Sequence, residues 1–425
     1  MSGRLPARAC DRVRLGLVVV LVAVVAGLIG SLVRYLSIGI ETGSFGFDCT
    51  AAPDGVGAAP LWRRLLVAGL AGLVCGCCWW RIRRRPRGMP PGIAQAVDPD
   101  PARRARMPAL VDTADALAQL LIVGAGMSLG REAAPRILAA IGGQAVLDRT
   151  GVGEETRRLL IGSAAGAGLA AIYNAPVAAA LYTIELVLHP DLRTRRGWAQ
   201  AGLTGLICGI ATLVSWVFNR NRPIYELPTS RTAAVCGPWA LVVVVAALVA
   251  GRCFNALIGV AKKYAPPTRM LIWTVPLGAL AVAGLAVWQP RIVGNGQVVV
   301  QAVITGGVPL PALAVLLLAK ACGTAVGLVT GSTGGLLTPS LAVGACLGAC
   351  LGGVARLDPA TTMVLAITGA GCVLALNQKA PFFGALFAIE LTRAPLSTAI
   401  TVLAAVGILW RLDLLVCGVP GGRRR

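Results

Sequence analysis

Charged residues are scarce in this sequence of 425 residues. Only 13% of the residues are Asp, Glu, Lys or Arg, whereas 56% are hydrophobic and the mean hydropathy is +0.76. A soluble protein of this size carries far more charge on its surface. The scarcity therefore excludes a soluble globular protein and indicates an all-α, polytopic membrane protein.

Acidic residues are the scarcer of the two charged classes, with 18 Asp and Glu against 39 Lys and Arg, for a formal net charge of +21. The arginines gather in connectors and termini, at residues 4–14, 81–87, 103–106 and 423–425. They do not form an amphipathic or aromatic-interleaved face. The pattern predicts cytoplasmic loops in contact with anionic lipid headgroups, and it excludes a nucleic-acid-binding surface.

Metal-binding and catalytic side chains are also few. The only histidine is His189, beside Pro190 at the end of a segment, and the thirteen cysteines are scattered, mostly within apolar runs. Cysteine in such a run usually behaves as a small hydrophobe. With no facing ligands, no nucleophile–base pair and no nucleotide-binding loop, we expect no metal, no cofactor, no disulfide framework and no enzymatic activity.

Long apolar runs dominate what is present. Residues 15–33 form the first, and they lack a clear small-residue cleavage site, so we expect a retained membrane helix. A polar, glycine-rich connector over 41–59 follows. Further apolar runs include a helix over 108–129 and a last, short one over 396–410.

These runs predict a simple domain organisation. Residues 1–14 are a cytoplasmic N-terminal segment, residues 15–410 a transmembrane transport domain, and residues 411–425 a short basic tail without a cytoplasmic regulatory domain. The expected location is the cell membrane, with multiple passes.

A charged pair lies at the edge of the apolar tract 116–127, in the motif 130–135, GREAAP. Glycine precedes Arg131 and Glu132, proline follows, and an apolar helical pattern continues to Val146. The motif thus predicts a helix that begins inside the membrane. Because a helix start exposes unpaired N–H groups and the positive end of the helix dipole, it attracts anions. We therefore predict an anion site with Glu132 as an anion-shaped occupant.

An internal repeat accompanies this motif. Residues 163–186 align without gaps with residues 368–391, so that Ala175-Pro176 falls on Ala380-Pro381 and Glu185 falls on Glu390. Proline removes a backbone hydrogen bond, so each segment is predicted to break into two shorter helices.

The same offset places Gly130 on Gly335 and matches the motif to residues 334–339. We therefore expect two homologous halves, roughly 62–218 and 233–410. Broken helices at matching positions are typical of repeat-built transporters, whose binding site lies between the halves.

These motifs together resemble the CLC family of voltage-gated-type chloride channels and chloride/proton antiporters, as a divergent bacterial-type member. Residues 128–132, SLGRE, resemble the GREGP motif, and residues 331–339, GSTGGLLTP, resemble the GxFxP region. The two Ala-Pro segments match the helices that follow those motifs. The resemblance covers roughly residues 87–410. It implies two inverted helical repeats with broken half-helices, a homodimer with one pore per subunit, and an anion held by helix N-termini.

Carried over by this resemblance, Glu132 is the gating glutamate. An ionised Glu132 competes with a halide for the same amide groups, and a protonated one swings away, so that opening is linked to a proton. A carboxylate merely paired to Arg131 is the alternative. The resemblance implies an anion-binding set of Gly88, Met89, Gly130, Arg131, Ala133, Gly335, Leu336 and Leu337.

Three other ionisable residues in apolar segments are less clearly assigned. For Glu185 and Glu390 we favour a structural role, such as bonding exposed backbone amides, over ion handling. Lys320 either snorkels to the membrane surface or lines an aqueous vestibule.

Four positions depart from the family pattern. The anion-coordinating serine becomes Gly88, or Met89 in another register, so a hydroxyl donor is lost. The internal proton-transfer glutamate is replaced by Leu186, which carries no proton. No late tyrosine occurs between residues 404 and 425, and the proline of the first motif is displaced to Pro135.

The sequence therefore predicts passive or weakly proton-coupled transport of chloride or a related halide. A transporter selective for fluoride or another anion, and a membrane sensor or scaffold that conducts nothing, are the alternatives. Ion preference, proton stoichiometry and regulation are left open.

Overall fold

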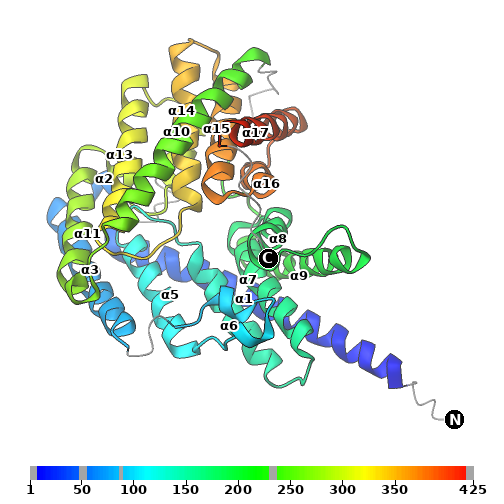
Figure 1. Cartoon of the computed structure of the whole chain (residues 1–425). Helices are drawn as coiled ribbons and strands as arrows, with labels where there is room; N and C mark the ends of the chain where they lie inside the picture. Colours follow the sequence, from blue (N-terminus) through cyan, green and yellow to red (C-terminus); the bar gives the residue numbers. More distant parts are fainter. Residues whose placement is uncertain (1–6, 47–54, 86–89, 229–236, 418–425) are drawn as a thin grey trace. The chain divides into compact units, whose positions relative to one another are not determined.

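Helices with short connectors make up the part of the chain that the computed structural model describes, residues 7–46, 55–85, 90–228 and 237–417 (Figure 1). Nine helices in these ranges are long and apolar enough to cross a membrane, and three further apolar helices are too short. No strand occurs there; Gly130 and Gly335 form an isolated antiparallel bridge. The predicted all-α, multi-pass membrane fold is confirmed.

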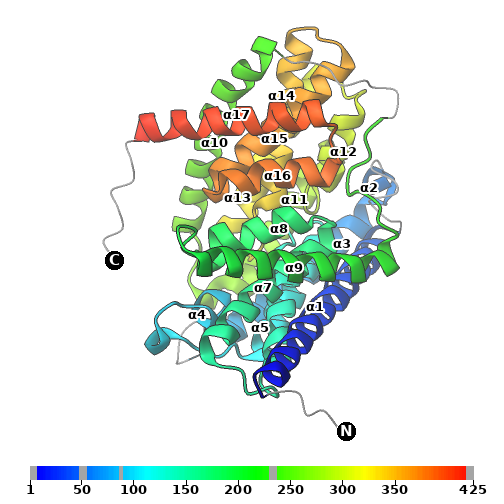
Figure 2. The same cartoon turned by 90° about the vertical axis from the view of Figure 1, so that its right-hand side faces the viewer.

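The chain divides into two compact units. The first comprises Met1–Tyr35, Met89–Ala116 and Ala134–Arg222. It holds most of α1 (Ala7–Phe45), the start of α5 (Ala109–Gly124), and α4 (Ile93–Ala96), η1 (Pro101–Arg103), α6 (Ala133–Leu147), α7 (Glu154–Tyr173), α8 (Pro176–Thr183), η2 (Ile184–Leu188) and α9 (Arg195–Asn219). Within it α7, α8 and α9 pack side by side (Figure 2).

The second unit comprises Leu36–Gly88, Leu117–Ala133 and Pro223–Arg425. It holds the ends of α1 and α5, and α2 (Gly55–Ala58), α3 (Leu61–Arg83), α10 (Gly237–Lys263), η3 (Thr268–Met270), α11 (Leu271–Trp288), η4 (Pro290–Ile292), α12 (Gln297–Thr305), α13 (Leu310–Val329), α14 (Leu337–Val354), α15 (Pro359–Gln378), α16 (Pro381–Thr392) and α17 (Leu396–Cys417). Its most extensive helix contact is that of α14 with α15, and α16 lies beside α17 (Figure 2).

Glycine permits the close approach of α14 and α15. A Cβ atom on Gly344 would collide with the carbonyl of Gly369, and one on Gly348 would collide with the carbonyl of Leu365. Membrane helices have little hydrophobic drive to associate, so small residues that let backbones approach supply much of the packing. These glycines hold the helix that carries the site described below.

Both predicted helix breaks are confirmed, and they share one geometry. In the first unit α7 ends at Tyr173, Asn174 is left-handed with φ of 53°, and its N–H bonds the carbonyl of Ala170. Pro176 then begins α8. Proline suits the first helical position, because its missing N–H would find no partner there.

The second unit repeats this pattern at the aligned residues. Lys379 follows α15 with φ of 54° and bonds the carbonyl of Ala375, and Pro381 begins α16. The division into halves at 62–218 and 233–410 remains a prediction from the sequence.

Three predicted helix ends were wrong. Helix α1 continues to Phe45 rather than ending near residue 33, because Glu41 has a buried ionic partner within the second unit. Helix α17 continues to Cys417 rather than residue 410, and its Asp413 pairs with Arg252 of α10 at 2.8 Å. In the other direction, α5 stops at Gly124 instead of residue 129, just before Gly126, whose φ of 114° is incompatible with a helix.

Candidate functional site

The carboxylate of Glu132 is completely buried in the second unit. Its Oε1 accepts the backbone N–H of Thr338 at 2.7 Å and also the hydroxyl of the same residue. Hydrogen bonds to an ionised group are roughly twice as strong as those between neutral groups. Glu132 is therefore held at one helix end by a donor pair from a single residue.

That helix end is the start of α14. Leu337 is the first residue of α14, and Leu336, the residue before it, has an apolar side chain that cannot cap the helix. The N–H of Thr338 belongs to the first turn, whose N–H groups find no acceptor inside the helix. Glu132, distant in sequence, supplies the missing acceptor and places a negative charge at the positive end of the helix dipole.

Two glycines leave the space that this carboxylate occupies. Gly130 and Gly335 exchange both backbone hydrogen bonds, each N···O distance being 2.7 Å. A Cβ atom on either glycine would collide with Oε2 of Glu132. The bridge thus brings the two predicted motifs together, and the carboxylate fits in its observed place only with glycine at both positions.

Arg131 forms a buried ion pair with Glu41 at the end of α1. Its Nη1 lies 2.6 Å from Oε1 of Glu41, and the two side chains are 8% and 9% exposed. Its Nη2 donates to Oε1 of Gln297 at 3.3 Å. Since an uncompensated charge inside a membrane protein is expensive, this pairing accounts for the tolerance of Arg131 at a buried position.

Gln297 links this pair to the segment that carries Tyr225. Its Nε2 donates to the carbonyl of Ile224 at 3.5 Å, and the N–H of Tyr225 donates to the carbonyl of Leu391 at 3.0 Å. Tyr225 is 1% exposed, and its hydroxyl has no hydrogen-bond partner among the residues that the structure describes. The charges of Glu132 and Arg131 both act on it, so a buried hydroxyl lies in the field of the candidate site.

Lys320 was predicted either to snorkel to the membrane surface or to line an aqueous vestibule, and the structure shows neither. Its side chain is fully buried in α13, and Nζ donates to the carbonyls of Ile292 and Gly294 at 3.0 and 2.8 Å. It therefore neither snorkels to a surface nor lines an open vestibule. It anchors the irregular segment that precedes α12.

The structure thus brings Gly130, Arg131 and Glu132 together with Gly335, Leu336 and Leu337 in the second unit. Ala133, the next of the predicted residues, is the first residue of α6. Gly88 and Met89 lie outside the described residues. The roles assigned to these positions remain predictions.

The two acidic residues at matching repeat positions are both half-buried. Glu185 lies in η2, which has π-helical geometry, and Glu390 lies in α16. Leu186 is in η2 as well, directly after Glu185.

Sequence reasoning missed Thr338, Glu41, Gln297 and Tyr225. Thr338 could have been found, because it follows Leu337 and puts a hydroxyl in the first turn of the helix whose amides were predicted to bind an anion. The other three carry no local signal, since their relation to the site depends on where distant segments lie.

Comparisons with known proteins agree on one family. The family model described as voltage gated chloride channel matches residues 71–409. The voltage-gated ClC-type chloride channel ClcB of Escherichia coli K12 is 28% identical over 354 residues, which are 78% of this chain and 79% of ClcB.

Solved structures show the same fold. That of a slow cyanobacterial Cl⁻/H⁺ antiporter superposes with a TM-score of 0.78 at 19% identity, covering 99% of this chain and 96% of its own. That of a CLC-type fluoride/proton antiporter superposes with a TM-score of 0.68 at 18% identity, covering 96% and 98%.

The buried ion pair predicts a stability effect at Glu41. Glu41→Gln leaves the Arg131 guanidinium without its charged partner, and removing one member of a buried pair typically costs about 3–5 kcal/mol. We expect a clearly lower thermal unfolding midpoint in detergent. Glu226→Gln, which changes an exposed carboxylate in the same unit, is the control. Equal midpoints for the two variants would show that the pair does not stabilise the fold.

Proposed function

The chain belongs to the voltage-gated chloride channel family, the CLC proteins, and on that premise we propose that it carries chloride or a related halide through a pore gated by Glu132. The family model covers most of the chain, so CLC-type anion transport by a multi-pass membrane protein is its general activity. The identity of the gate, the anion and the degree of proton coupling are our proposal. A homodimer with one pore per subunit is proposed with it.

The observation that carries the proposal is the carboxylate bound at the start of α14. Glu132 accepts the N–H and the hydroxyl of Thr338. A halide needs the same things, namely N–H and O–H donors at the positive end of a helix. Glu132 and the anion therefore compete for one set of donors, and the anion enters when the carboxylate leaves.

Protonation releases the carboxylate. A neutral carboxyl group loses most of its attraction to the helix end and to charge-assisted donors. Its departure then opens the path, so anion flux should rise as the pH falls. In this proposal, opening is coupled to a single proton at Glu132.

We propose weak rather than tight proton coupling. Two of the similar structures belong to a Cl⁻/H⁺ antiporter and a fluoride/proton antiporter. In this chain, however, the position of the internal proton-transfer glutamate is Leu186, and a hydrocarbon side chain accepts no proton. A proton that reaches Glu132 therefore has no acidic residue at that position to continue through.

Fluoride is the second candidate substrate. Gly88 and Met89 provide no side-chain hydroxyl where the family pattern has serine, and one similar structure is that of a fluoride/proton antiporter. We propose chloride as the first candidate because the similar ClcB protein is named a chloride channel. A sensor or scaffold that conducts nothing is the candidate from another class, favoured by the same missing hydroxyl. No catalytic chemistry is proposed.

Glu132→Gln tests the gate. The amide cannot ionise and binds the helix end more weakly, so we expect chloride efflux from liposomes to become faster at neutral pH and nearly independent of pH. Efflux from wild-type protein under the same conditions is the control. If the variant keeps the full pH dependence of the wild type, Glu132 is not the proton-sensitive gate.

Thr338 offers a matched pair of variants. Thr338→Val removes the hydroxyl donor at nearly constant shape, whereas Thr338→Ser retains it. A hydrogen bond to a charged group contributes about 1.5–3 kcal/mol, so losing it should favour the open form by about tenfold or more. We expect faster chloride efflux at neutral pH for Thr338→Val and near wild-type efflux for Thr338→Ser. Identical efflux from both would mean that this hydroxyl does not hold the gate.

Parallel efflux assays separate the substrates. Purified protein in liposomes is loaded in turn with chloride, fluoride and nitrate, each with and without a proton gradient. We expect chloride to leave fastest and its reversal potential to shift little with the pH gradient. Faster fluoride efflux would select the second candidate, and no flux of any anion from folded protein would select the scaffold.

A further inference from the structure

A polar cavity of about 220 Å³ lies in the first unit, and its described lining includes none of the residues assigned above to the anion path. Four arginines are on its wall, two from the connector before α5 and two from the start of α7. They are Arg104, Arg106, Arg157 and Arg158. Four guanidinium groups around one space make the cavity a candidate site for a negatively charged ligand.

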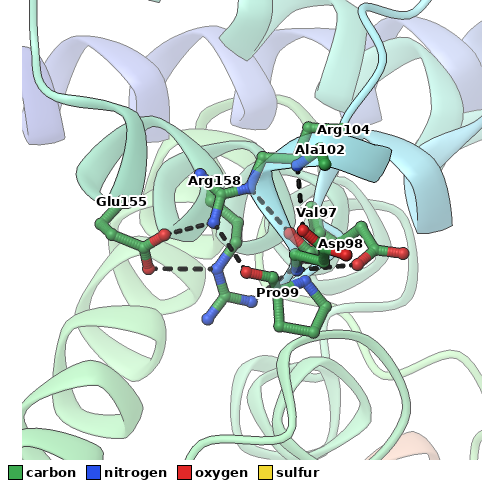
Figure 3. Close-up of polar contacts among 8 residues, drawn as sticks. Val97, Asp98, Pro99, Ala102, Arg104, Glu155 and Arg158 are labelled. Carbon is green, nitrogen blue, oxygen red and sulfur yellow. Dashed lines mark hydrogen bonds and ion pairs between the residues drawn. The ribbon is translucent and has the colours of Figure 1, made fainter.

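Two of these arginines are fixed by several partners (Figure 3). Arg104 donates from Nε to the carbonyl of Asp98 at 2.7 Å, and its Nη2 contacts the carboxylate of Glu155. Arg158 donates from Nη1 to the carbonyl of Val97 at 3.2 Å, and its Nε lies 3.5 Å from Oε2 of Glu155. Their side chains are only 10% and 11% exposed. Both guanidinium groups are therefore held in place at the cavity wall.

The other two arginines share one carboxylate. Arg157 binds Oδ1 of Asp148 at 2.5 Å through Nη2, and Arg106 binds Oδ2 of the same residue through Nη2. A guanidinium group has five N–H donors in a planar fork. Each uses Nη2 for Asp148, and the other N–H groups of its guanidinium are donors that Asp148 does not occupy.

The charges around the cavity favour an anion. On the cavity wall the four arginines face one carboxylate, that of Glu154, and Asp148 and Glu155 pair with them without being part of the lining. Hydrogen bonding by Arg104 lowers the pKa of Glu155, so this carboxylate is ionised at neutral pH. Helix α7 also begins here, after Gly153, and its positive dipole end adds to the field.

We propose that this cavity binds a phosphate group, either free phosphate or pyrophosphate or the headgroup of an anionic phospholipid. Planar guanidinium forks match phosphate oxygens in pairs, and several of them suit an anion of more than one charge better than a halide. The volume is below the roughly 300–1,000 Å³ of typical small-molecule sites, which favours a phosphate group over a nucleotide. The arginine-rich connector is predicted to face the cytoplasm, where both anionic lipid headgroups and phosphates are present.

The test uses the full chain, purified in detergent and stripped of lipid. One arm titrates inorganic phosphate and pyrophosphate by calorimetry. The other counts bound lipid by native mass spectrometry after incubation with phosphatidic acid or phosphatidylcholine. The variant is Arg106→Gln with Arg157→Gln, which spares the more deeply fixed Arg104 and Arg158. Arg149→Gln is the matched control, because this exposed arginine lies on the same unit but not on the cavity wall.

We expect the double variant to weaken binding about tenfold or more, as for the loss of charge-assisted hydrogen bonds, and Arg149→Gln to bind like wild type. Loss confined to phosphate and pyrophosphate identifies a soluble ligand, and loss confined to phosphatidic acid identifies a lipid. If the double variant does not fold, Arg106→Lys with Arg157→Lys keeps the charge, and its weaker binding supports the same site. Wild-type protein that binds no phosphate species, or equal binding by the control and the double variant, overturns the proposal.

Discussion

The hydrogen bonds from Thr338 to Glu132 are the interaction on which the candidate site depends. A helix that begins inside a membrane leaves N–H groups that water cannot satisfy, and a fully buried carboxylate needs donors of its own. In this chain the carboxylate of Glu132 accepts the N–H of Thr338 at the start of α14, so each group satisfies the other. The Gly130–Gly335 bridge brings the two segments close together, and a Cβ atom at either glycine would occupy the place of the carboxylate.

A second layer of contacts keeps the surrounding charges in balance. Arg131 is neutralised by Glu41 and bonded by Gln297, which also holds the backbone before Tyr225. Lys320 is satisfied by two carbonyls. These cations have partners of their own, and the two donors to Glu132 described above both come from the start of α14. In the proposed function, an anion competes for this helix end and displaces the carboxylate from it.

A gate of this kind works only if its closed form is modestly favoured. Hydrogen bonds to a charged group contribute about 1.5–3 kcal/mol, which is comparable to what a bound anion regains at the same donors. Competition between carboxylate and halide is then governed by anion concentration and by protonation of Glu132. In the proposed function, Leu186 stands at the internal position where the family pattern has a proton-transfer glutamate, and this is the reason for proposing weak coupling.

The sequence by itself determined what depends on neighbours along the chain. Apolar runs specify membrane helices, Pro176 and Pro381 specify the two helix breaks, and Gly130, two residues before Glu132, precedes a helix start within an apolar region. Only the tertiary structure decided that Thr338 is the donor to Glu132, that Glu41 neutralises Arg131, and that Arg104 and Arg158 converge on Glu155. The tertiary structure also decided where α1 and α17 end. Each helix continues past its apolar run because a charged residue there, Glu41 or Asp413, pairs with an arginine distant in sequence. Backbone breaks are local events, whereas the burial of a charge is stable only when distant segments bring its partner to it.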